Sequence, residues 1–124
     1  MKPIRSMMLL AAWPALAAAQ AAFPTDFPAG ATPLDSEALR TRLTGTVQYY
    51  KTATGSEIRL QIDSKILYVN ATNFSDNGAW RVEGSALCAD LKRLPPGCSE
   101  IRAVGDEPYL QRSTNKEVVR MYTK

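Results

Sequence analysis

Residues 78–98 constrain the fold most strongly, because this short segment contains both cysteines of the chain and several turn signals. The turn signals in and beside it are Asn77-Gly78, Glu83-Gly84 and Pro95-Pro96-Gly97. Trp80 and Val82 alternate with charged residues, which is typical of a half-buried strand. Residues 85–91 are predicted to be its partner strand. The segment therefore predicts consecutive antiparallel strands joined by tight turns.

Residues 1–21 have the layout of a secretory signal peptide. Lys2 and Arg5 form a positive region, residues 7–16 are apolar, and residues 19–21 fit a small-x-small cleavage site. The alternative is a buried N-terminal helix. The apolar run is too short for a transmembrane segment, so we expect no membrane span. The mature protein is predicted to be periplasmic or secreted.

The charge balance argues against a nucleic-acid partner. The chain has 15 Lys+Arg and 12 Asp+Glu, which gives a net charge of +3. Loss of Lys2 and Arg5 with the signal peptide leaves 13 basic and 12 acidic residues, a net charge of +1. A protein that binds nucleic acid needs a clustered basic surface, and the sequence has none.

The two cysteines, Cys88 and Cys98, are predicted to form a disulfide, because an exported chain reaches an oxidising compartment. The chain has no histidine, and two cysteines alone cannot complete a four-ligand zinc site. Their spacing also differs from the C-x-x-C motif of redox enzymes. We therefore expect a structural disulfide, no metal and no cofactor.

Residues 22–33 are rich in Ala, Pro and Thr and are predicted to be a linker, followed by one β-meander domain over residues 34–124. Residues 35–43 are predicted to form a short helix, with Asp35 as the N-cap. Strands with apolar alternation or β-branched and aromatic enrichment then follow at residues 46–52, 58–62, 65–72, 80–83, 85–91, 99–104, 109–112 and 117–122. The fold class is therefore all-β, an antiparallel eight-stranded meander with one short N-terminal helix.

A resemblance supports this fold. The motifs on which the resemblance rests are Leu43-Thr44-Gly45, Gly78-Ala79-Trp80-Arg81-Val82, Leu87-Cys88, Cys98 and Tyr109-Leu110. In this order the chain resembles small exported bacterial proteins of unknown function with a lipocalin-like meander. The resemblance implies a barrel or half-open barrel and export. It implies no catalytic residue.

Without histidine, the usual general base and the Ser-His-Asp triad are excluded. Carboxylates remain, and most of them, including Asp76, are interpreted as solvated surface charges. The alternative is a small envelope hydrolase with paired carboxylates, which would draw on Glu83, Asp90 and Glu100. No catalytic residue is predicted.

Four residues are candidates for ligand binding. Arg59 and Arg81 would form a basic stripe on one sheet face if the strand register aligned them. Tyr68 and Trp80 could line a small apolar pocket. The alternatives are a solvated sheet face for the arginines and core packing for the aromatic residues.

The function that these observations favour is a non-enzymatic binding module for a protein partner or a small envelope-derived ligand. Inhibitor and immunity-type roles belong to this class. The alternatives are the carboxylate hydrolase and a purely structural envelope protein.

Overall fold

The computed structural model describes residues 23–124. The predicted signal peptide lies outside the described residues. The elements are β1 Thr32–Pro33, α2 Ser36–Leu43, β2 Thr46–Lys51, β3 Glu57–Ile62, β4 Ile66–Ala71, β5 Phe74–Glu83, β6 Ala86–Leu91, β7 Gly97–Val104, β8 Glu107–Gln111 and β9 Val118–Arg120.

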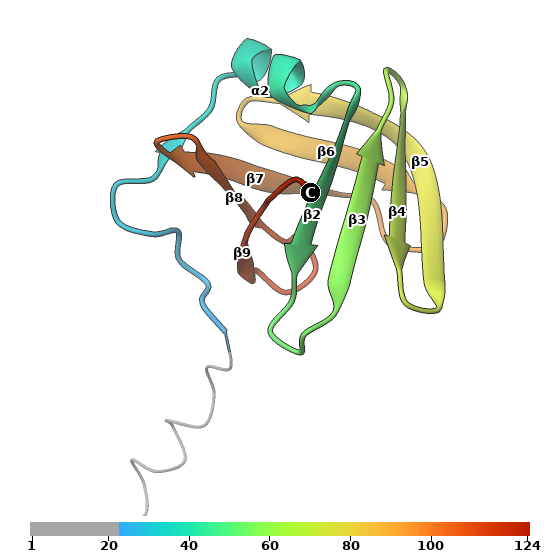
Figure 1. Ribbon diagram of the computed structural model, residues 1–124. Coiled ribbons are helices and arrows are strands. Elements are labelled where there is room, and N and C mark those ends of the chain that lie inside the picture. Colours follow the sequence, from blue (N-terminus) through green and yellow to red (C-terminus); the bar gives the residue numbers. More distant parts are fainter. Residues whose placement is uncertain (1–22) are drawn as a thin grey trace, which may run out of the picture.

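Strands β2 to β9 form one antiparallel sheet in chain order, which curls into a nearly closed barrel (Figure 1). Each strand pairs with the next one, so every connection is a hairpin. The two ends of the sheet meet where Tyr49 and Tyr122 exchange backbone hydrogen bonds of 2.8 and 2.9 Å. The predicted all-β, eight-stranded meander with one short N-terminal helix is confirmed.

Helix α2 covers one end of the barrel (Figure 1). Asp35 is its N-cap, and the Asp35 carboxylate accepts a hydrogen bond from the Ala38 backbone N–H at 2.8 Å. Leu39 and Leu43, four residues apart on one helix face, are fully buried. Because these two side chains enter the barrel, the helix closes this end.

The inward-facing residues of the strands form the core. Leu60, Ile62, Leu87, Ile101 and Leu110 are buried, and Ile58, Trp80 and Val82 pack against them half-buried. Tyr68, a core candidate, is instead exposed. It lies between the inward-facing Leu67 and Val69 on β4, and adjacent residues of a strand face opposite ways.

Part of the predicted linker contacts the barrel. Thr32 pairs with Ala103, so β1 adds a short strand beside β7. The Arg102 guanidinium lies over the Phe27 ring, 4.5 Å from its centroid. The Val118 backbone N–H donates to the Pro24 carbonyl at 2.9 Å. Residues 23–33 therefore lie against the sheet.

The turn predicted at Asn77-Gly78 is wrong. Both residues lie inside β5, where Gly78 pairs with Leu67 of β4. The β4–β5 turn falls at Thr72-Asn73, and Asn73 takes the positive φ of 61° that such a turn needs. Gly78 has a different purpose: a Cβ there would lie 2.0 Å from the Asp90 carbonyl oxygen. Glycine therefore lets β5 and β6 approach closely at a bend.

Cys88 and Cys98 form the predicted disulfide, with an S–S distance of 2.10 Å. They are directly opposite each other on β6 and β7, with Cα atoms 3.9 Å apart. The bond therefore joins two strands that already pair, and it closes only a short loop.

Removal of this disulfide is expected to destabilise the fold. Closing a loop with a sequence separation of 10 contributes about 2.7 kcal/mol in the chain-entropy model. We expect a Cys88→Ala/Cys98→Ala double variant to lose about that much free energy of unfolding in urea titrations. Reduced wild-type protein is the control and should behave like the variant. A loss below about 1 kcal/mol would show that the bond does not constrain the unfolded chain.

Candidate binding site at the open end of the barrel

The barrel contains a cavity of about 100 Å³ at the end opposite α2. Its walls are mostly inward-facing apolar side chains from five strands. They include Leu60, Leu67, Val69, Leu87, Ala89 and Leu110. Since α2 fills the other end, the cavity is a blind apolar space rather than a channel through the barrel.

The cavity opens between two loops, the one after β6 and the one after β8. Leu94 and Pro95 belong to the first loop, and Ser113 and Thr114 to the second. Ser113 and Thr114 are exposed to solvent and also line the cavity. The apolar space is therefore accessible from outside at this end.

An ion pair between half-buried Arg112 and buried Glu117 lies at the mouth. Arg112 donates to the Glu117 carboxylate at 3.0 Å, and the other Glu117 oxygen accepts the Ala53 backbone N–H at 2.8 Å. Glu117 is buried, although its place in the last predicted strand suggested a solvated face. The bond from Ala53 holds the loop after β8 against the turn between β2 and β3, and the ion pair fixes Arg112 beside the cavity.

Tyr50 is one of the few polar residues in the mostly apolar wall of the cavity. Burial raises its pKa above the usual range, and the nearby Arg112 guanidinium, 5.9 Å from the ring centroid, opposes this shift. The phenol is therefore neutral at physiological pH and retains a hydroxyl hydrogen that can be donated to a ligand.

Asp76 holds the other loop of the mouth. Its carboxylate accepts backbone N–H groups of Lys92, Arg93 and Leu94 at 3.1, 2.9 and 2.8 Å. Burial raises the pKa of Asp76, but these bonds and that from Asn77 outweigh it and lower the pKa. Asp76 was interpreted as a solvated turn residue, which is wrong: it faces inward on β5 and is buried. It positions Leu94 at the cavity mouth.

The predicted arginine stripe does not form between Arg59 and Arg81. Arg59 pairs with Asn70, which pairs with Ser75 on β5. Arg81 lies six residues beyond Ser75, roughly 20 Å along the strand. The two cations are therefore too far apart to hold one small anion, and both lie outside the cavity.

The two aromatic candidates lie on opposite faces of the sheet. Tyr68 faces solvent on β4. Trp80 faces inward, but its indole N–H donates to the Asp63 carbonyl at 2.7 Å, at the turn between β3 and β4. Neither residue lines the cavity. A ligand-binding role for these two residues and for the two arginines stays a prediction that the geometry does not support.

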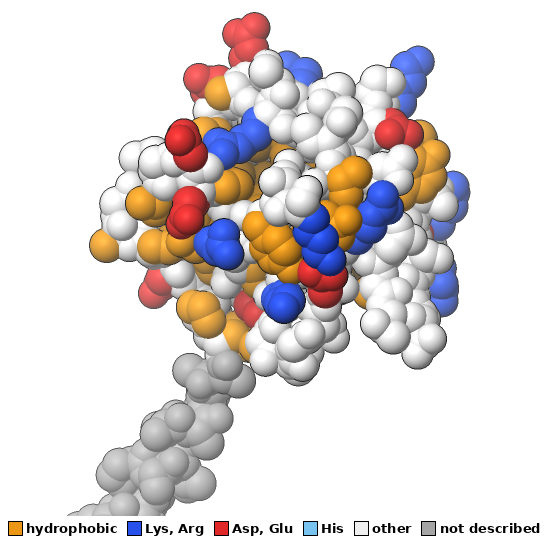
Figure 2. Space-filling model, in the orientation of Figure 1, with side chains coloured by type: hydrophobic (Ala, Val, Ile, Leu, Met, Phe, Trp, Pro, Cys, Tyr) orange, Lys and Arg blue, Asp and Glu red, His pale blue; other side chains and the backbone are white. Residues whose placement is uncertain are grey.

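The three carboxylates of the hydrolase hypothesis do not converge on a cleft. Glu83 and Asp90 are exposed, and both pair with Arg81, at 2.5 and 3.3 Å. Glu100 pairs with Arg102 at 2.6 Å. Each carboxylate therefore has an arginine partner on the outer face of the sheet, where opposite charges are interspersed, as Figure 2 shows for one face of the molecule.

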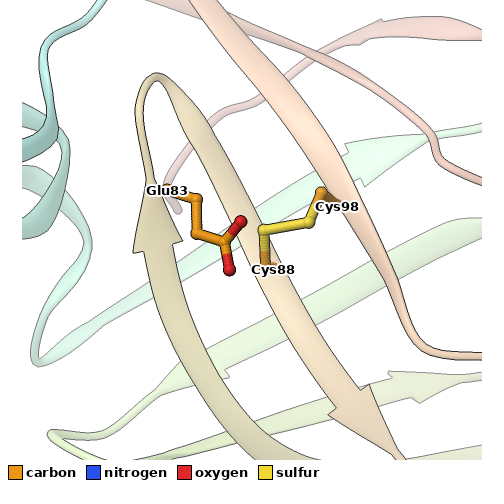
Figure 3. Close-up of side chains that lie close together, drawn as sticks. All are labelled: Glu83, Cys88 and Cys98. Atoms are coloured by element: carbon orange, nitrogen blue, oxygen red, sulfur yellow. A yellow bond between two sulfur atoms is a disulfide. The ribbon is translucent and has the colours of Figure 1, made fainter.

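Glu83, Cys88 and Cys98 form a cluster whose oxygen and sulfur atoms lie within 4.8 Å of one another (Figure 3). The two sulfur atoms are bonded to each other, so neither offers the thiolate that metal binding needs. The carboxylate is bound to Arg81. The cluster is therefore a disulfide between β6 and β7 that lies beside a surface ion pair.

Within residues 23–124, no helix is both long and apolar enough to cross a membrane. Comparison of the chain with protein-family models, with curated proteins and with solved structures gives no significant match.

Proposed function

We propose that the protein is an exported, non-enzymatic binding module that takes an apolar group of a small ligand into the open end of its lipocalin-like barrel. The observation that carries this proposal is the blind apolar cavity with its solvent-accessible mouth. Concave, mostly apolar sites with a few polar groups are typical of small-molecule binding. The disulfide and the layout of residues 1–21 support export.

A protein partner has less support than a small ligand. Among the described residues, the exposed large hydrophobic side chains are Tyr68 and Val104, which lie on different strands. They form no contiguous apolar patch of the kind that marks a protein interface. The three carboxylates of the hydrolase alternative do not line the cavity, and each is paired with an arginine.

The size of the cavity defines the apolar group. A cavity of 150 Å³ holds benzene, so about 100 Å³ holds a group of roughly four carbon atoms. Burial of four methylene groups contributes about 3 kcal/mol, which corresponds to a Kd of about 5 mM for the apolar group alone. NMR titration at millimolar concentration is the suitable measurement.

The cavity can be filled to test the proposal. Ala89→Leu places three more carbon atoms into the cavity wall. We expect this variant to bind pentan-1-ol at least tenfold more weakly than wild type, measured by chemical-shift titration. Ala86→Leu adds the same carbons on the outer face of the same strand and should bind like wild type. Equal binding by the two variants, or no saturable shift in wild type up to 50 mM (about ten times the Kd estimated above), would contradict the proposal.

A further inference from the structure

A surface depression with both polar and apolar lining residues is continuous with the apolar cavity. Its lining includes Pro95, Gly97, Arg112, Ser113, Thr114 and Lys116, and all of these except Lys116 also line the cavity. We call this depression the vestibule. Neither lining contains a carboxylate. A ligand with its apolar group in the cavity would therefore place its other end beside two cationic side chains.

The charged side chains at the vestibule have a net charge of +1. Arg112 is paired with the buried Glu117, which does not line the vestibule. Within residues 23–124, no carboxylate is within ion-pair distance of the Lys116 ammonium group. The net charge of Arg112, Lys116 and Glu117 is +1. This charge matches an anion with a single negative charge better than a doubly charged phosphate.

Lys116 takes a backbone conformation that its residue type disfavours. Its φ is +67°, in the left-handed region where glycine has no steric penalty. The Lys116 backbone N–H donates to the Arg112 carbonyl at 3.0 Å, and the Lys116 carbonyl accepts from the Gln111 side chain at 3.4 Å. Strained residues of this kind concentrate at functional sites. The conformation of Lys116 is therefore compatible with a functional role for this residue.

Gly97 lies where the vestibule and the cavity meet. A Cβ at this position would lie 2.9 Å from the Ser113 hydroxyl oxygen. Ser113 and Thr114, which both carry a hydroxyl group, line the vestibule and the cavity and therefore lie where the two meet. Each hydroxyl can donate a hydrogen bond to an anionic oxygen.

From these observations we propose that the ligand is a short-chain monocarboxylate. Its alkyl chain of about four carbons occupies the cavity, and its carboxylate lies in the vestibule beside Lys116, Arg112 and the two hydroxyls. The inference rests on the proposed function, because it assumes that the apolar end of the ligand enters the barrel.

The test compares pentanoate with pentan-1-ol at pH 7 and low salt, by NMR titration of wild type, Lys116→Gln, Lys116→Gly and Lys65→Gln. Both probes have the same number of carbon atoms and differ in charge. Lys65→Gln is the matched control, since Lys65 is an exposed lysine in the turn between β3 and β4. We expect wild type to bind pentanoate about fivefold more tightly than pentan-1-ol, and 0.5 M salt to reduce this preference.

Lys116→Gln is expected to weaken pentanoate binding about threefold and to leave pentan-1-ol binding unchanged. Lys116→Gly should show the same loss of preference while raising the melting temperature by about 4 °C, because glycine removes the strain. Lys65→Gln should bind both probes like wild type.

Each result separates the two proposals. Equal binding of the two probes, with no effect of Lys116→Gln, would overturn the monocarboxylate inference and leave the apolar site standing. A pentanoate preference that Lys65→Gln reduces as much as Lys116→Gln does would also overturn the inference, because it would show a diffuse effect of charge. No binding of either probe would overturn both proposals.

Discussion

Gly78→Ala is expected to reduce the free energy of unfolding by at least about 3 kcal/mol. A Cβ at this position would lie 2.0 Å from the Asp90 carbonyl oxygen and 2.9 Å from the Leu91 Cα. Both contacts are with backbone, so no side-chain rotation relieves them, and β5 and β6 must move apart. Urea titration of wild type and variant, followed by far-UV circular dichroism, measures the loss.

Gly97→Ala is the matched control, because Gly97 is also a strand glycine without a positive φ. Its added Cβ would meet only the Ser113 side chain, which can rotate away. We expect this variant to lose less than about 1 kcal/mol. If Gly78→Ala loses no more than Gly97→Ala, the close approach of β5 and β6 does not require glycine.

Asp76→Ala is expected to lower the melting temperature by about 15 °C or more, because three backbone N–H groups of the loop after β6 lose their acceptor. The same variant should weaken pentan-1-ol binding, since Leu94 and Pro95 of this loop line the cavity. Differential scanning calorimetry and the NMR titration measure the two effects. A melting temperature within about 3 °C of wild type would contradict the role given to Asp76.

The pH dependence of stability gives a second test of Asp76. Its pKa is lowered in the folded state, so its contribution is present above the unfolded pKa of about 3.9 and is lost as pH falls through the folded pKa. Asp76→Asn should therefore flatten the loss of stability below pH 4. Glu57 also has a lowered pKa, through hydrogen bonds from Tyr122 and Lys124. Glu57→Gln is thus needed as a parallel variant to separate the two groups.

The sequence predicts the strands well because most of them show either apolar alternation or enrichment in β-branched and aromatic residues. Leu60 and Ile62 on β3 are an example of alternation. The helix is also predicted well, since Asp35 is a clear N-cap. The start of β5 was predicted too late in the sequence, because Asn-Gly is a strong turn signal. Interpreting Asn77-Gly78 as a turn removed Asp76 from the strand. With β5 starting at Phe74, the same alternation places Asp76 on the inner face with Trp80.

The candidate site was not predictable, because it depends on how the barrel ends close. Tyr49 and Tyr50 are adjacent in one strand and face opposite ways, but the sequence does not say which one faces inward. Arg112 and Glu117 flank a short turn, a spacing that is equally typical of solvated charges. Only the packing of that turn against β2 buries Glu117 and brings Arg112 to the cavity.

The central claim is that an apolar group of the ligand lies inside the barrel at the end opposite α2. Intermolecular nuclear Overhauser effects between pentanoate and methyl-labelled protein test it most directly. The account predicts contacts from the terminal methyl of the ligand to the methyl groups of Leu87, Leu110 and Val69, which line the cavity. Contacts confined to surface methyl groups such as those of Val104, under conditions where pentanoate saturates the protein, would contradict it.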